Sequence, residues 1–62
     1  MQTPEQVARH WTSHFEDAAR ENYRHARATE GDWSRVYARV ARRYARTADA
    51  WRARLAKETG TA

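Results

Sequence analysis

The stretch Thr29-Glu30-Gly31-Asp32, at the middle of a chain of 62 residues, decides how the rest of the sequence folds. Gly31 suits the left-handed backbone that ends a helix, and either Asp32 or Thr29 can cap a following helix. Because these signals coincide near the chain midpoint, they predict one domain of two helices, over about 4–28 and 33–58, with a turn at about 29–32. A single continuous helix is the alternative, since one glycine inside a helix costs only about 1 kcal/mol.

The first half of the chain carries a helix start followed by one apolar stripe. In Thr3-Pro4-Glu5-Gln6, Thr3 is a typical N-cap, and Pro4 stands where its missing N–H costs nothing. Gln6 is placed to reach back and close a capping box. Residues then recur at three- and four-residue spacing, which is typical of one helix face: Val7, Trp11, Phe15, Ala18, Asn22 and Ala26.

The second half repeats this pattern with a longer aromatic stripe. Its members alternate four and three residues apart, as in a coiled-coil seam: Trp33, Tyr37, Val40, Tyr44, Thr47 and Trp51, with Leu55 beside them. Folding the chain back at the turn gives an all-α, two-helix antiparallel hairpin. Residues whose numbers add to about 61 or 62 then lie side by side, which places Trp11 beside Trp51.

A lone hairpin of this length lacks sufficient apolar surface. Half-buried, its large apolar side chains supply about half of the burial needed to offset the conformational entropy of two ordered helices. There is no cysteine, so no disulfide can supplement the core. We therefore expect a homodimeric four-helix bundle. The expected oligomer core comprises Trp11, Phe15, Trp33, Tyr37, Val40, Tyr44, Trp51 and Leu55.

The two flanks of the second stripe differ in chemistry. One flank is basic, with Arg35, Arg39, Arg42, Arg43, Arg46 and Lys57, and the other is lined by Ala38, Ala41, Ala45 and Ala48. The first helix has its own ridge of His10, His14, Asp17, Glu21 and His25. One hand of the hairpin packs the alanines against the first helix and leaves the arginines outward. The opposite hand brings Asp17 and Glu21 against Arg43 and Arg39. The sequence leaves both hands open.

Net charge and hydropathy bear on the cellular location of the protein. The formal net charge is +4, with residues 1–32 at about −2 and residues 33–62 at about +6. No apolar stretch is long enough for a membrane span, and the first residues lack the pattern of a secretory signal. These observations predict a cytoplasmic protein with no membrane partner.

The basic flank is the strongest candidate binding site. Arg35, Arg39, Arg42, Arg43 and Arg46 can contact phosphates along one helix face, and a pI near 10.3 agrees with that interpretation. No helix-turn-helix, RNP or zinc-finger spacing accompanies them, and no tryptophan is interleaved with them. A solvated face partly paired with acids is the competing interpretation, and it is preferred on sequence alone.

A metal site is a weaker candidate. His10 and His14 are four residues apart and Asp17 follows one turn later, so three possible metal ligands share one helix side. Two helices enclose little space from which to exclude water, so we expect no metal, no cofactor and no catalysis. Asn22, a polar residue in the middle of a stripe, is a candidate for fixing register or oligomer state.

Together these patterns favour a non-enzymatic binding, adaptor or regulatory protein that docks a macromolecular partner through a helix face. A protein partner is preferred, by a small margin, over DNA or RNA. The alternative is a helical dimer that binds nucleic acid through the five arginines.

Overall fold

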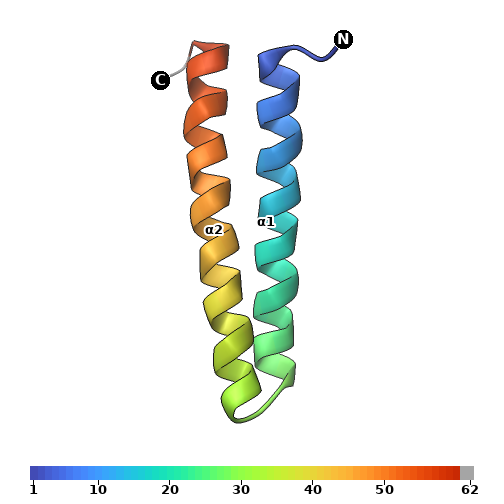
Figure 1. Cartoon of the computed structure of the whole chain (residues 1–62), viewed down its shortest axis with the longest axis vertical. Coiled ribbons are helices and arrows are strands. Elements are labelled where there is room, and N and C mark those ends of the chain that lie inside the picture. The colour runs from blue at the N-terminus through green and yellow to red at the C-terminus, as the bar shows by residue number, and fades with distance from the viewer. Residues whose placement is uncertain (61–62) are drawn as a thin grey trace.

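Two antiparallel helices make up the part of the chain that the computed structural model describes, residues 1–60. Helix α1 runs over Pro4–Ala28 and α2 over Asp32–Thr59 (Figure 1), and the start of α1 and the end of α2 lie at the end of the hairpin opposite the turn. The all-helical, two-helix prediction is confirmed, and the chain turns at the expected place instead of continuing as one helix.

The start of α1 follows from its first residues. The hydroxyl of Thr3 accepts a hydrogen bond from the backbone N–H of Gln6 at 3.1 Å, and the Gln6 side chain accepts one from the Thr3 N–H at 2.9 Å. Two of the N–H groups that every helix start leaves unpaired are thereby satisfied. The capping box predicted at Thr3 and Gln6 is confirmed.

The turn is shorter than predicted and is capped differently. Helix α1 ends at Ala28, and Gly31 is the N-cap of α2, with φ 69° and ψ −145°. Only glycine adopts this region readily, so the need for a glycine here is confirmed, but Gly31 does not end α1 as expected. Neither Asp32 nor Thr29 caps α2 through its side chain. The Ser34 hydroxyl instead donates to the carbonyl of Ala26 across the turn, at 2.8 Å.

Small side chains fill the seam between the helices. The buried residues are Ala8, Thr12, Ala19, Ala41 and Ala48, and Ala41 is 0% exposed. Methyl side chains let two helix backbones approach closely, which is why the alanine flank of α2 faces α1. Of the two hands left open by the sequence, the structure adopts the one that turns the arginine flank outward.

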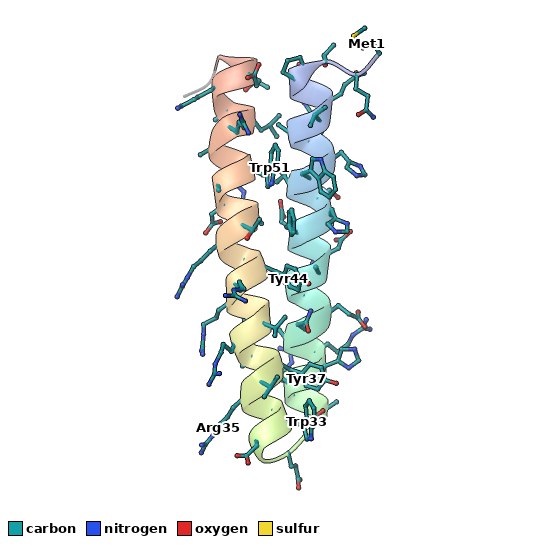
Figure 2. All side chains as sticks on the ribbon, viewed as in Figure 1. Met1, Trp33, Arg35, Tyr37, Tyr44 and Trp51 are labelled. Atoms are coloured by element: carbon teal, nitrogen blue, oxygen red, sulfur yellow. The ribbon has the colours of Figure 1, made fainter. Side chains whose placement is uncertain are left out.

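The aromatic stripes consequently lie beside the seam. Trp11 and Trp51 stack with ring centroids 6.4 Å apart, as their expected pairing required, and Phe15 stacks on Tyr44 at 5.9 Å. Among the described residues no large side chain is fully buried. The predicted core residues therefore form one half-covered face in the single chain (Figure 2), where the labelled aromatic side chains follow one another between the two ribbons.

Polar residues close to the seam are satisfied within their own helix. The Thr12 hydroxyl donates to the carbonyl of Ala8 at 2.7 Å, and the Asn22 amide donates to the carbonyl of Ala18 at 2.8 Å. Asn22 thus makes no hydrogen bond to α2, and the register role expected for it is not seen in the single hairpin.

The hairpin is a flat, elongated body. Its dimensions are 43 by 22 by 11 Å, so it has two broad faces and two narrow edges. Neither α1 nor α2 contains, within residues 1–60, a stretch both apolar and long enough to span a bilayer.

Enlarging the seam should destabilise the fold. For Ala41→Leu we expect a loss of about 1–3 kcal/mol in the free energy of unfolding, because a fully buried methyl leaves no room for three more carbons. Chemical denaturation followed by circular dichroism, at one fixed protein concentration, measures this loss. Ala53→Leu, at an exposed position of the same helix, should stay within about 0.5 kcal/mol of the unaltered chain. Equal losses in the two variants would contradict the alanine seam.

Candidate functional site

One broad side of the hairpin carries the aromatic face, which we define as Val7, Trp11, Phe15, Trp33, Tyr37, Val40, Tyr44, Trp51 and Leu55. Near the chain ends, its rings form a continuous stack from Trp51 through Trp11 and Phe15 to Tyr44. Near the turn, Trp33 lies against Tyr37. These side chains come from both helices, so the face exists only when the hairpin is closed.

The aromatic face is substantially open to solvent. Trp33 is 65% exposed and Trp11 37% exposed, and the other members are half-buried. The guanidinium of Arg54 lies 5.4 Å from the centre of the Trp51 ring, at the edge of the face. Its apolar members lie next to one another, as in a protein-protein contact surface.

The outer edge of α2 carries the Arg ridge, which we define as Arg35, Arg39, Arg42, Arg43 and Arg46. All five side chains are exposed, and the labelled Arg35 extends away from α1 (Figure 2). At 100° per residue, the ridge lies opposite Ala41 and Ala48, the seam positions of the same helix. Four of the five line a shallow surface depression together with Val40.

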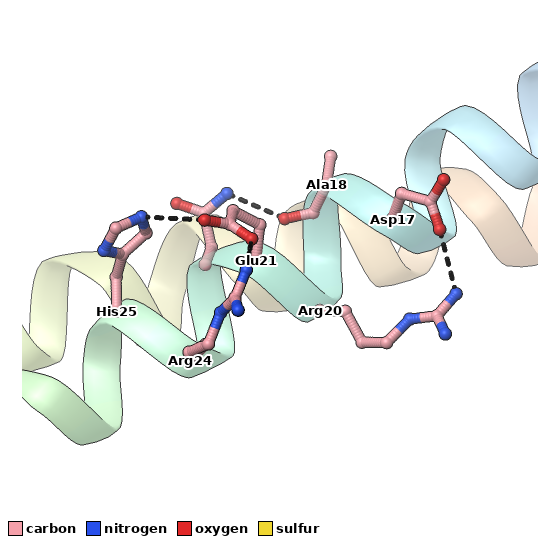
Figure 3. A network of polar contacts seen from close by, with 7 residues as sticks. Asp17, Ala18, Arg20, Glu21, Arg24 and His25 are labelled. Carbon is pink, nitrogen blue, oxygen red and sulfur yellow. Dashed lines mark hydrogen bonds and ion pairs between the residues drawn. The ribbon is translucent and has the colours of Figure 1, made fainter.

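None of the five ridge arginines makes an ion pair within residues 1–60. The acids that might have neutralised them pair elsewhere. Asp17 pairs with Arg20 at 3.0 Å, and Glu21 pairs with Arg24 and His25, all on α1 (Figure 3). The question left open by the sequence, whether Asp17 and Glu21 cover the ridge, is answered for the single hairpin: they do not.

The helices differ in net charge as a result of composition. Helix α1 has four arginines and four acids, whereas α2 has eight basic residues and three acids. Its acids are Asp32 at its start and Asp49 and Glu58 in its second half, so residues 33–48 contain five arginines and no acid. The positive charge of the chain is therefore concentrated along one edge of the molecule.

Two contacts of the other broad side were not foreseen from the sequence. Arg52 bridges the helices by pairing with Glu16 at 3.3 Å, and it also pairs with Asp49 at 2.6 Å. Tyr23, 38% exposed, lines a shallow hollow on this side with Glu16 and Arg52. Such contacts depend on the hand of the hairpin, which the sequence left open.

The histidines pack against aromatic rings. The His10 and His14 rings are nearly parallel with centroids 6.4 Å apart, and each meets the Trp11 ring edge-on. His25 stacks on Tyr37 at 5.2 Å. Among residues 1–60 no group of three or more histidines and carboxylates is arranged to hold a metal ion, so His10, His14 and Asp17 do not come together as a site.

The chain matches no protein-family model, no curated protein and no solved structure.

The pKa of Glu21 depends on the two positively charged or protonatable side chains that contact it, Arg24 and His25. The hydrogen bond and positive charge of Arg24, with a smaller contribution from His25, lower the pKa of Glu21 below its ordinary value. A lowered folded-state pKa means that the small stabilisation is present above the ordinary pKa of Glu and is lost as the pH falls through the lowered value. Arg24→Gln should raise the pKa of Glu21, as measured by NMR titration of its carboxyl carbon.

Arg20→Gln is the matched control for this titration. It removes an arginine of the same helix that pairs with Asp17, so the pKa of Glu21 should stay where it is in the unaltered chain. An unchanged Glu21 pKa in Arg24→Gln would contradict the ion pair.

Proposed function

We propose that this chain is a non-enzymatic helical binding protein that works as a homodimer, closing its aromatic face on a second copy and presenting the Arg ridge to a macromolecular partner. The observation that carries the proposal is the composition of the buried core. Four alanines and one threonine are the only described residues that a single hairpin buries. The side chains with the most apolar surface to remove from water stay on an open face.

The surface area of the chain supports association. It exposes 5038 Å², whereas a compact monomer of 7.3 kDa exposes about 4,200 Å². The difference is about 800 Å², which is the area that each partner contributes to a standard interface. One broad face, 43 by 22 Å, is also of about this size.

A second copy is the occupant that the aromatic face fits best. Two-fold symmetry places the same face on both partners, so the rings and aliphatic side chains of one copy contact those of the other. Packing two hairpins in this way makes an antiparallel four-helix bundle with the aromatic residues in its core. The aromatic rings then carry most of the binding energy.

The outward surfaces of such a dimer support a binding role over catalysis. The Arg ridge faces away from both the seam and the aromatic face, so it stays accessible after assembly. The hollows along Asp17–Arg27 of α1 and along the Arg ridge are open to solvent and lined mainly by exposed charged side chains, with little enclosure for a reacting group.

A pair of variants on α1 tests the assembly. Trp11→Glu places a charge in the proposed interface and should weaken self-association about thirtyfold, equivalent to about 2 kcal/mol for the loss of a buried aromatic contact. Tyr23→Glu has the same charge change at nearly the same exposure, on the opposite broad side, and should leave the dimer intact. Sedimentation equilibrium measures the dissociation constants.

Two results would overturn the proposal. One is an unaltered chain that sediments as a compact, cooperatively melting monomer at micromolar concentration. The other is a Tyr23→Glu variant that dissociates as much as Trp11→Glu, because the aromatic face would then not be the specific interface.

A further inference from the structure

We infer that the Arg ridge binds the phosphate backbone of a nucleic-acid duplex, without reading its sequence. This inference rests on the proposed function and names the partner of its outward surface. It reverses the small preference for a protein partner that the sequence alone gave, because the structure shows the ridge exposed and unneutralised.

The geometry of the ridge suits a linear polyanion. From Arg35 to Arg46 the ridge covers twelve residues and a rise of about 16 Å, at 1.5 Å for each of the eleven steps between them. Arg35, Arg39, Arg42 and Arg46 recur every three or four residues and Arg43 directly follows Arg42, so the five guanidinium groups follow one side of α2. A duplex presents about nine phosphates over the same length, counted on both strands. Over the length of the ridge a duplex therefore has more phosphates than the ridge has arginines, so each of the five arginines can have a phosphate partner.

The chemistry of the ridge favours phosphate over protein. Guanidinium groups bind phosphate oxygens through two parallel hydrogen bonds, and all five ridge residues are arginine. A protein interface takes most of its energy from buried aromatic and aliphatic anchors. Beside the ridge lie the small apolar side chains of Val36 and Val40, whereas the aromatic residues of α2 lie on the aromatic face.

The position of the ridge, away from the aromatic rings, favours a duplex over a single strand. Proteins that hold single strands stack the bases on aromatic side chains within the basic groove. Here the nearest aromatic rings stack on one another, as Phe15 does on Tyr44, and none belongs to the ridge. The ridge also has no Asn or Gln, the side chains that recognise adenine, and most hydrogen bonds between proteins and DNA go to phosphate and sugar, so we expect its contacts to be chiefly to the backbone.

The test is fluorescence anisotropy with a labelled mixed-sequence DNA duplex of about 20 base pairs, titrated with the full chain over a salt series. If the five arginines of one ridge each neutralise a phosphate, affinity should fall about 500-fold for a fourfold rise in salt. The triple variant Arg39→Gln, Arg43→Gln, Arg46→Gln should bind at least tenfold more weakly at low salt. Its slope against the logarithm of salt should be smaller by about three.

The matched control is the triple variant Arg9→Gln, Arg20→Gln, Arg24→Gln. It removes the same charge from arginines that are paired with acids on α1, and its salt slope should remain that of the unaltered chain. Circular dichroism checks that each variant stays helical. If the triple ridge variant loses its helicity, the three single ridge variants replace it, each expected to reduce the slope by about one.

Three further probes compete with the duplex in the same assay. A duplex RNA that displaces the DNA supports recognition of the phosphate backbone. Poly-glutamate or anionic lipid vesicles that compete as well as duplex DNA at equal charge would overturn the inference in favour of an acidic protein or a membrane surface. Tighter binding of single-stranded than of duplex DNA would overturn it as well.

Duplex binding by the Arg ridge and self-association through the aromatic face can be tested separately. Each chain carries a complete ridge, so a monomeric Trp11→Glu variant should still bind the duplex, with the avidity of the second ridge removed. A dimer that binds no duplex at low salt refutes the role of the ridge and leaves the assembly standing. A monomer that binds with the expected salt slope refutes the assembly alone.

Discussion

The close approach of α1 and α2 through alanine side chains is the constraint on which the other features depend. Methyl groups at Ala8, Ala19, Ala41 and Ala48 fill the seam, so larger side chains are displaced from it. On each helix the displaced apolar stripe moves to the same broad side, because the hairpin has a single hand. The arginine flank of α2 is left on the edge farthest from α1. The seam thus determines where both candidate surfaces lie.

Local ion pairs determine which charges remain available. Arginines and acids spaced three or four residues apart pair along α1, as Arg9 does with Glu5. Exposed pairs of this kind contribute less than about 1 kcal/mol each, so their effect on stability is small. Their effect on the electric field is larger, because α1 becomes electrically balanced while the middle of α2 keeps its full positive charge.

Much of the fold could be predicted from local signals. The capping residues Thr3 and Gln6, the glycine at position 31 and the spacing of the aromatic residues each specify backbone geometry within a few residues, so the helices and the turn were found. The hand of the hairpin was not, because it depends on which flank packs across the seam, a comparison between distant residues. The exposure of the Arg ridge and the contact of Arg52 with Glu16 follow from the hand, so they could not be predicted from the sequence either. The role of Gly31 was misplaced because the turn proved one residue shorter than expected.

The distribution of cross-helix polar contacts has a consequence for how the hairpin opens. Next to the turn, the bond from Ser34 to Ala26 ties the helices together, and farther along the seam Thr12 and Asn22 bond only within α1. Register is therefore tethered next to the turn by a part-buried hydrogen bond, and farther along the seam by the exposed ion pair of Arg52 with Glu16 and the fit of small side chains. Because an exposed ion pair holds two helices less firmly than a part-buried hydrogen bond, we expect thermal fraying to begin at the end of the hairpin opposite the turn. Backbone amides should accordingly be slowest to exchange with solvent in the seam turns closest to Gly31.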